Sequence, residues 1–206
     1  MESSVAAVSA WLRACSQEFD RRVEELNELD RILGDGDHGT NMQRGFAAAG
    51  ALDFGAQATA ADALRQVGMA LVKVVGGASG PLFGTFLLRT GAAWPTPLTV
   101  AGIHGALDVG LHGVMTRGKA ERGDKTIVDA LAPVVDSLAA SAAAGLPLDQ
   151  ALTAAALAGE AGRDATAPML ARRGRAALKA DRSIGVIDPG AVSMSIIVST
   201  GAHHLG

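Results

Sequence analysis

Residues 5–29 read VAAVSAWLRACSQEFDRRVEELNEL, and apolar side chains recur in them at steps of three and four. The recurring positions are Val5, Val8, Leu12, Cys15, Phe19, Val23, Leu26 and Leu29. Steps of three and four place side chains on one face of a helix. The pattern therefore predicts one long amphipathic helix that starts near Ser3 or Ser4.

The same period continues through most of the chain. It predicts further helices over residues 41–49, 61–74, 82–93, 100–116, 127–144, 148–169 and 191–200. Strand signals are almost absent, because no run of Val, Ile and Thr alternates for more than a few positions. Alanine, the most frequent residue, has the best helix propensity and lets helix axes approach closely. We therefore expect an all-α fold of about eight helices, a bundle or helical barrel, in a single domain over residues 1–206.

Several expected helix ends carry capping signals. Thr126 is followed three residues later by Asp129, which resembles a capping box with the shorter acid. Pro147 and Pro189 stand where helices usually begin. Residues 172–190 resist helix assignment. A loop of that length inside a compact domain is usually functional or mobile.

The composition excludes several classes of protein. Hydrophobic residues make up 49% of the chain and aromatic residues 3%, and 18 basic against 21 acidic side chains leave a net charge of −3. This balance excludes a disordered chain and argues against a nucleic-acid-binding protein. A single cysteine, Cys15, excludes a disulfide scaffold. Because no signal peptide or membrane-spanning run is apparent, we expect a cytoplasmic protein without membrane partners.

The most informative segment is residues 29–41, which read LDRILGDGDHGTN. On a continuous helix Asp30 and Asp35 would lie about 140° apart, but Gly34 can end the helix and let both carboxylates face Asp37. Three carboxylates at one point repel one another unless cations compensate them, and oxygen ligands favour Mg²⁺ or Ca²⁺ over zinc. The segment thus predicts a site for one or two divalent cations. The alternative is an Asp/Gly-rich turn whose carboxylates cap backbone N–H groups.

Two other interpretations of this segment fail. Its glycines match G-x-G-x-x-G, but no strand precedes them and two aspartates would stand against a pyrophosphate. A calcium EF-hand would need a polar ligand and a glutamate where the chain has Gly39 and Phe46.

A second segment, residues 76–84, reads GGASGPLFG. Small residues before Pro81 at a helix start make a loop whose N–H groups can face an anion. The loop contains no lysine, so it is not a Walker P-loop. By itself it could equally be an ordinary interhelical turn. Together with the acidic segment it suggests a phosphate supported by Mg²⁺.

Two further loops are rich in charge. Arginines at 172, 173, 175 and 182 lie in a loop that contains several glycines. There they can bind phosphate or stack on a base. A solvated basic face is the alternative interpretation. Residues 118–126 form a charged turn in which Asp124 can cap a helix, or a plain connection.

The remaining candidates are interpreted structurally. His104 and His112 lie near one helix face without an acidic partner at metal-binding spacing, so we expect structural or surface histidines. Cys15 lies on the apolar face of the first expected helix and is assigned to the core.

Six motifs resemble, in order, those of the nucleotide-binding L subunit of dihydroxyacetone kinase. They are Asp30 through Gly34-Asp35-Gly36-Asp37-His38-Gly39 to Asn41-Met42, Gly76-Gly77-Ala78-Ser79-Gly80-Pro81-Leu82-Phe83-Gly84-Thr85, Arg117-Gly118-Lys119-Ala120, Gly123-Asp124-Lys125-Thr126, Arg173-Gly174-Arg175-Ala176 and Asp188-Pro189-Gly190-Ala191. They span nearly the whole chain. The length of 206 residues is similar to that of the free-standing subunit of the bacterial phosphotransferase-system-dependent enzyme.

The resemblance implies an eight-helix antiparallel barrel with ADP and two Mg²⁺ at one end. It implies metal ligation by Asp30, Asp35 and Asp37. The nucleotide contacts that it implies are His38, Gly39, Thr40, Asn41, Ala78, Ser79, Gly118, Ile127, Arg175, Asp188, Pro189 and Gly190.

The resemblance also implies a kinase subunit that retains its nucleotide as a coenzyme and forms no covalent intermediate. In the family, a multiphosphoryl carrier (the M subunit) phosphorylates bound ADP. The resulting ATP passes its phosphoryl group to dihydroxyacetone on a separate K subunit.

The chain departs from the family at two places. Ala177-Leu178 stands where the family usually has Ser-Tyr, which can loosen the lid over the nucleotide or alter a partner surface. Ile127 stands where methionine is common. Another small ketone or ketose stays open as the substrate, because the substrate sits on another polypeptide.

Two alternatives belong to other functional classes. A nucleotide-sensing regulatory subunit that docks on a transcriptional regulator or a kinase would use the same residues. A metal-dependent phosphohydrolase is disfavoured, because the sequence offers no dedicated base to activate water.

Overall fold

The computed structural model describes residues 2–53 and 59–206, and within these it consists of helices and loops without strands. The α-helices are α1 (Glu2–Arg21), α2 (Val23–Leu33), α3 (His38–Gly50), α4 (Ala60–Val74), α5 (Ser79–Ala92), α6 (Val100–Gly118), α7 (Ile127–Ala143), α8 (Leu148–Ala165) and α9 (Pro189–Leu205). A 3₁₀ helix, η2 (Ala176–Ser183), lies in the long loop before α9. Among the described residues no helix combines the length and apolar character that a membrane span requires.

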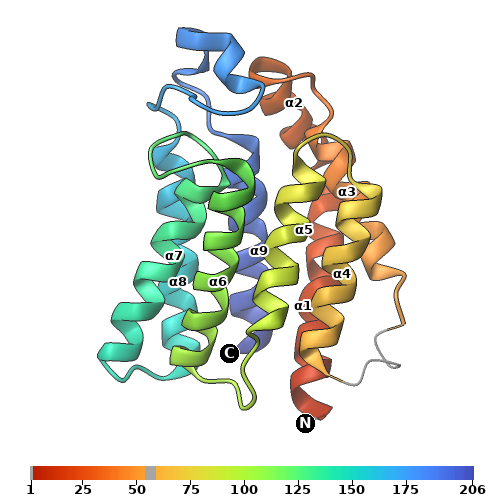
Figure 1. Cartoon of the computed structure of the whole chain (residues 1–206), viewed down its shortest axis with the longest axis vertical. Coiled ribbons are helices and arrows are strands. Elements are labelled where there is room, and N and C mark those ends of the chain that lie inside the picture. The colour runs from red at the N-terminus through yellow and green to blue at the C-terminus, as the bar shows by residue number, and fades with distance from the viewer. Residues whose placement is uncertain (1, 54–58) are drawn as a thin grey trace.

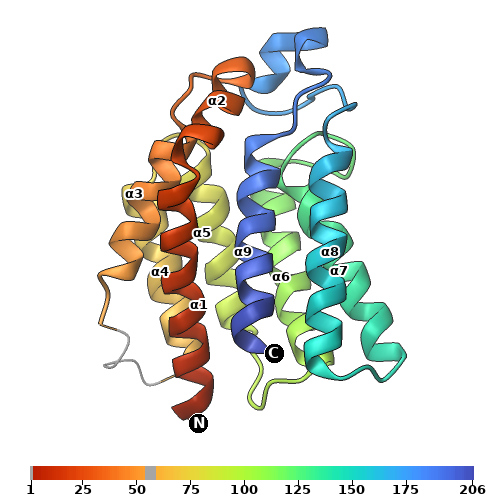
Figure 2. The same ribbon diagram turned by 180° about the vertical axis from the view of Figure 1, so that it is seen from behind.

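Eight of these helices form a closed ring. Helices α1 and α3 to α9 run alternately up and down (Figure 1), and each packs against the next. Figure 2 shows α9 beside both α1 and α8, so the ring closes between the first helix and the last. Helix α2 and η2 lie together at one end of it. The predicted all-α antiparallel barrel of eight helices is confirmed.

The prediction of one continuous first helix was wrong, because the chain bends at Arg22 between α1 and α2. The cause is a contact with α3, since Asn27 donates to the Thr40 hydroxyl at 3.0 Å and accepts from the Thr40 amide at 3.0 Å. Gly39 lies directly against the Val23 carbonyl, where no side chain would fit. The bend carries α2 across the end of the barrel.

Other expected boundaries also differ, since α3 begins at His38 instead of 41 and α5 begins at Ser79 instead of 82. Helix α8 ends at Ala165 instead of 169, where the Thr166 hydroxyl donates to the Arg163 carbonyl at 2.6 Å before Pro168. The loop over 172–190 contains η2 and ends where Pro189 begins α9. The capping box of Thr126 and Asp129 is present at the start of α7, as predicted.

The core fills the barrel between the helices. Trp11 on α1 stacks on Trp94 with 6.0 Å between ring centroids, and its indole donates to the Ile197 carbonyl at 2.8 Å. Cys15 is fully buried, as its sequence position predicted, and burial raises the pKa of its thiol to about 12. Cys15 is therefore a packing residue, because so little thiolate exists near neutral pH.

Glycines allow α4 and α5 to pack backbone against backbone. A Cβ atom on Gly68 would lie 2.9 Å from the Gly84 carbonyl oxygen, and one on Gly84 would lie 2.8 Å from the Gly68 carbonyl oxygen. Neither helix can accept even a methyl group there without moving. The position of α5 matters for the site because its first residues line the cavity described below.

We predict that Gly68→Ala lowers the free energy of unfolding by about 1–3 kcal/mol, because the methyl group forces α4 from α5. The matched control is Gly105→Ala on α6, where an added Cβ meets nothing within 4 Å. There alanine should stabilise by about 0.5–1 kcal/mol through helix propensity. Urea unfolding of both variants measures the difference, and equal stabilities would contradict close α4–α5 packing.

Candidate functional site

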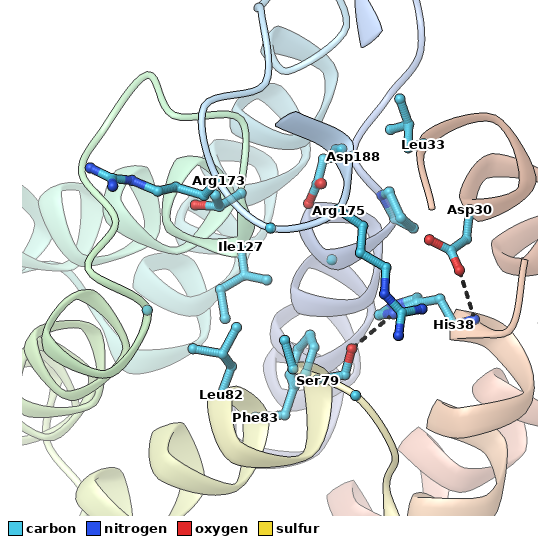
Figure 3. Close-up of a pocket in the computed structure, with 18 of the residues that line it drawn as sticks. Asp30, Leu33, His38, Ser79, Leu82, Phe83, Ile127, Arg173, Arg175 and Asp188 are labelled. Carbon is cyan, nitrogen blue, oxygen red and sulfur yellow. Dashed lines mark hydrogen bonds between the residues drawn. The ribbon is translucent and has the colours of Figure 1, made fainter. Parts of the chain in front are cut away.

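A cavity of about 480 Å³ opens at the end of the barrel where α2 and η2 lie. Five segments far apart in the sequence line it, namely residues within 30–41, 76–83, 114–128, 173–176 and 188–190. Figure 3 shows Asp30 and His38 on one side of the cavity and Ile127 and Leu82 on the other. The cavity therefore has a polar side and an apolar side.

The Asp30 carboxylate organises the polar side. Helix α2 ends at Leu33, and the Gly34 amide donates to the Asp30 carbonyl at 2.5 Å. The chain then folds back, and Oδ2 of Asp30 accepts three amide hydrogen bonds, from Gly36 at 3.0 Å, Asp37 at 3.0 Å and His38 at 3.2 Å. Gly36 makes the turn with φ at +82°. One carboxylate oxygen thus holds the whole loop between α2 and α3.

This turn brings three carboxylates together. Asp30, Asp35 and Asp37 each offer one oxygen, and these oxygens lie within 4.8 Å of one another. The Arg175 guanidinium, from the loop on the opposite side, forms an ion pair with Asp35. A set of carboxylate oxygens around one point fits a hard divalent cation such as Mg²⁺ and does not fit a metal that prefers nitrogen or sulfur. The predicted convergence of these aspartates is present, and their ligand role stays a prediction.

His38 links the acidic turn to two other helices. Its Nδ1 lies 3.1 Å from the Ser79 hydroxyl at the start of α5, and its Nε2 lies 2.8 Å from the Ser193 hydroxyl on α9. Burial lowers the pKa of the imidazole to about 4, although the nearby charges of Asp30 and Asp37 oppose this shift. The ring is therefore neutral near pH 7, with one donor and one acceptor nitrogen.

The segment around Ser79 places a helix start at the cavity. Gly77 adopts a φ of +63°, and the chain turns into α5 at Ser79. The first amides of an α-helix have no partner within the helix, and the helix dipole favours an anion there. Gly77, Ala78 and Ser79 line the cavity, so the Ser79 hydroxyl and the backbone N–H groups of this turn can contact phosphate oxygens.

The opposite side of the cavity is apolar. Leu82 and Phe83 from α5, Val114 from α6 and Ile127 at the start of α7 line it. Ile127 is almost fully buried, and Gly190 in the first turn of α9 lies directly against its side chain. A flat aromatic base would fit such a surface better than a charged group would.

A buried lysine connects the two loops beside this surface. Lys125 is only 1% exposed, and its ammonium group donates to the carbonyls of Thr166 at 2.6 Å, Ala167 at 3.3 Å and Val186 at 2.5 Å. Its burial lowers its pKa. Arg173 donates to Asp124 at 2.8 Å and adds a second link. Lys125 thus fixes both ends of the 166–188 loop to the turn before α7.

Asp188 caps the helix that carries Ser193. Its carboxylate accepts from the Ala191 amide at 2.8 Å at the start of α9. Burial raises the pKa of Asp188 to about 7, while the charge of Lys125 partly opposes the shift.

The structure brings most of the predicted nucleotide contacts to this cavity. The lining includes His38, Asn41, Ala78, Ser79, Gly118, Ile127, Arg175, Asp188, Pro189 and Gly190. Gly39 and Thr40 do not line it, because both pack against α2. His112 is exposed and pairs with Asp108 at 3.3 Å, as expected for a surface histidine.

Sequence reasoning missed the buried roles of Lys125 and Ser193. The sequence places Lys125 in a charged turn. In the structure its ammonium group contacts carbonyls that are forty or more residues distant in sequence. Ser193 carried no signal except a polar position inside an apolar helix.

Residues 32–203 match the DAK2 domain family. The chain belongs to that family. It is 42% identical to the ADP-binding subunit of the PEP-dependent dihydroxyacetone kinase of Escherichia coli, over 96% of both chains. The predicted resemblance to such kinase subunits is confirmed.

Two larger proteins are similar to this chain over about a third of their length. An L-erythrulose 1-kinase of Mycolicibacterium smegmatis is 34% identical over 98% of this chain, which spans 35% of that protein. The crystal structure of the dihydroxyacetone kinase from C. freundii with AMP-PNP and Mg²⁺ superposes with a TM-score of 0.74 at 27% identity. That match covers 96% of this chain and 34% of the C. freundii chain.

We predict that Lys125→Met lowers the free energy of unfolding by about 2 kcal/mol or more, because buried carbonyls lose their donor. Hydrogen exchange should increase mainly over residues 166–188. Lys73→Met, at an exposed lysine of α4, is the control and should have little effect. Unchanged exchange in that loop would show that Lys125 does not hold it.

Proposed function

We propose that this chain carries ADP and ATP with two Mg²⁺ as the phosphoryl-transfer subunit of a ketone kinase. A multiphosphoryl carrier protein donates the phosphoryl group to ADP, and the group then passes to dihydroxyacetone held by a separate subunit. One observation carries the proposal. Three carboxylate oxygens lie within 4.8 Å of one another beside a cavity that the first residues of α5 also line. The E. coli relative, named as an ADP-binding subunit, supports it.

Asp30, Asp35 and Asp37 would hold the Mg²⁺ ions. Bound Mg²⁺ neutralises phosphate charge, which lowers the repulsion against an incoming oxygen nucleophile. Asp30 uses one oxygen to hold the loop, so its other oxygen is the one to face a cation. The ion pair of Arg175 with Asp35 supports this role, because it places a positive charge against the same cluster.

The remaining residues position the nucleotide. Ser79 and the backbone N–H groups of the turn at Gly77 and Ala78 would bind phosphate oxygens, and the surface around Leu82 and Ile127 would receive the base. Arg175 stands across the cavity and would close over the phosphates. Phosphoryl transfer needs such positioning and charge neutralisation more than it needs a covalent protein group.

The ketone is the least constrained part of the proposal. The similarity to an L-erythrulose kinase favours a four-carbon ketose as a second candidate substrate. The nucleotide site would be the same for both, because the ketone would lie on another polypeptide.

We predict that Asp35→Asn and Asp37→Asn each weaken ADP binding in Mg²⁺ about tenfold or more while the fold stays intact, because each removes a charged ligand. Asp20→Asn, an exposed acid on α1, is the matched control. Calorimetry measures the affinities, and EDTA should remove the difference between wild type and variants. Unaltered ADP affinity in both site variants would refute the metal site.

Reconstitution tests the activity. The purified chain, a dihydroxyacetone-binding subunit, the phosphotransferase-system proteins and phosphoenolpyruvate should together produce dihydroxyacetone phosphate, and omission of this chain should stop it. If ADP binds but no ketone is phosphorylated, the nucleotide-sensing regulatory role replaces the kinase role.

A further inference from the structure

Three side chains on three helices form a hydrogen-bonded row that ends at the cavity. Ser193 on α9 contacts Nε2 of His38 on α3 at 2.8 Å, and Nδ1 of His38 contacts Ser79 on α5 at 3.1 Å. Ser193 is fully buried and His38 is 7% exposed, whereas Ser79 lines the cavity. The row therefore leads from the enclosed core to the site.

The burial of Ser193 sets the direction of this row. Among the described residues, Nε2 of His38 is the one side-chain hydrogen-bond partner of the Ser193 hydroxyl. A buried hydroxyl proton without an acceptor is costly, so Ser193 donates to Nε2. Nε2 is then the acceptor nitrogen, and the ring proton of the neutral imidazole lies on Nδ1.

The carbonyl of Pro189 also faces the imidazole and would favour a proton directed toward it. Pro189 is the first residue of α9, where the helical pattern already gives its carbonyl the N–H four residues later. The Ser193 hydroxyl has no comparable second partner among the hydrogen bonds of the described chain. The Pro189 carbonyl thus has a donor whichever ring nitrogen carries the proton, whereas the Ser193 hydroxyl has an acceptor in His38 only when Nε2 is unprotonated.

A proton on Nδ1 of His38 determines whether the Ser79 hydroxyl can donate a hydrogen bond into the cavity. Nδ1–H donates to the Ser79 oxygen, so the hydroxyl proton of Ser79 points elsewhere, and the cavity is the open direction. With the other tautomer, Ser79 would donate to His38 and would present only lone pairs to a phosphate. Lone pairs against an anionic oxygen repel it.

We infer that Ser193 is a positioning residue, which fixes the tautomer of His38 and so makes Ser79 a hydrogen-bond donor to a nucleotide phosphate. The part of this inference that concerns phosphate rests on the proposed function. The part that concerns the tautomer is a property of the chain without nucleotide.

The tautomer is measured first, by two-dimensional ¹H–¹⁵N NMR of the imidazoles in the wild-type chain without nucleotide. His38→Gln assigns the His38 signals among the five histidines. A protonated Nδ1 supports the inference, and a protonated Nε2 overturns it. Ser193→Ala should shift the ring toward the other tautomer or a mixture, whereas Ser193→Thr, which keeps a hydroxyl, should retain Nδ1–H.

ADP affinity in Mg²⁺ is measured next. Ser193→Ala should weaken binding roughly threefold to tenfold, as expected for one neutral hydrogen bond. The effect should vanish in a Ser79→Ala background, because Ser193 acts through Ser79. Ser195→Ala is the matched control, since Ser195 is also buried on α9 and takes no part in the row.

The two ideas fail in different ways. A wild-type chain that does not bind ADP contradicts the proposed function, while the NMR result still decides the tautomer. A chain that binds ADP equally well with Ser193→Ala and Ser195→Ala contradicts the positioning role. An undiminished loss from Ser193→Ala in the Ser79→Ala background also contradicts it, because that loss would be only structural.

Discussion

The site depends on the hydrogen bonds that one oxygen of Asp30 accepts. Three successive backbone amides, those of residues 36 to 38, converge on it. Charge-assisted hydrogen bonds of this kind are stronger than neutral ones, so they hold a turn that otherwise brings like charges together. The same contact sets where α3 begins and therefore where His38 enters the core. A change at Asp30 would disturb the acidic cluster and the His38 row together.

The barrel places the turn between α2 and α3 next to the other segments that line the cavity. Eight antiparallel helices place four helix connections and the bend into α2 at one end, so segments distant in sequence meet there. Close α4–α5 packing at Gly68 and Gly84 fixes where α5 begins. Lys125 fixes the long loop on the other side through carbonyl groups alone. The start of α5 and the long loop before α9 are thus fixed by contacts outside the cavity. The side chains that line the cavity remain available for a ligand.

Local signals explain what the sequence predicted. Helices follow from a period of three to four residues, and the acidic cluster follows from Gly34 and the short spacing of Asp35 and Asp37. The bend at Arg22 could not be predicted, because its cause is a contact with Thr40 across a turn. For the same reason the sequence could not show that Gly39 and Thr40, which it predicts as nucleotide contacts, pack against α2.

The roles of Lys125 and Ser193 could not be predicted, because their partners are distant in sequence. A lysine in a charged turn is normally solvated, and only the folded chain shows that Lys125 is enclosed by carbonyls. A serine inside an apolar helix gives no sign of its partner, although His38 lies 155 residues away in sequence. Sequence patterns reveal side chains that share one short segment, and the fold reveals those that meet across the barrel.

A crystal structure of the chain with ADP and Mn²⁺, in which anomalous scattering locates the metal, tests the proposed metal site most directly. We expect anomalous density between Asp30, Asp35 and Asp37, with the phosphates of ADP directed toward Ser79 and the start of α5. Density elsewhere, or ADP bound without metal at these carboxylates, would contradict it.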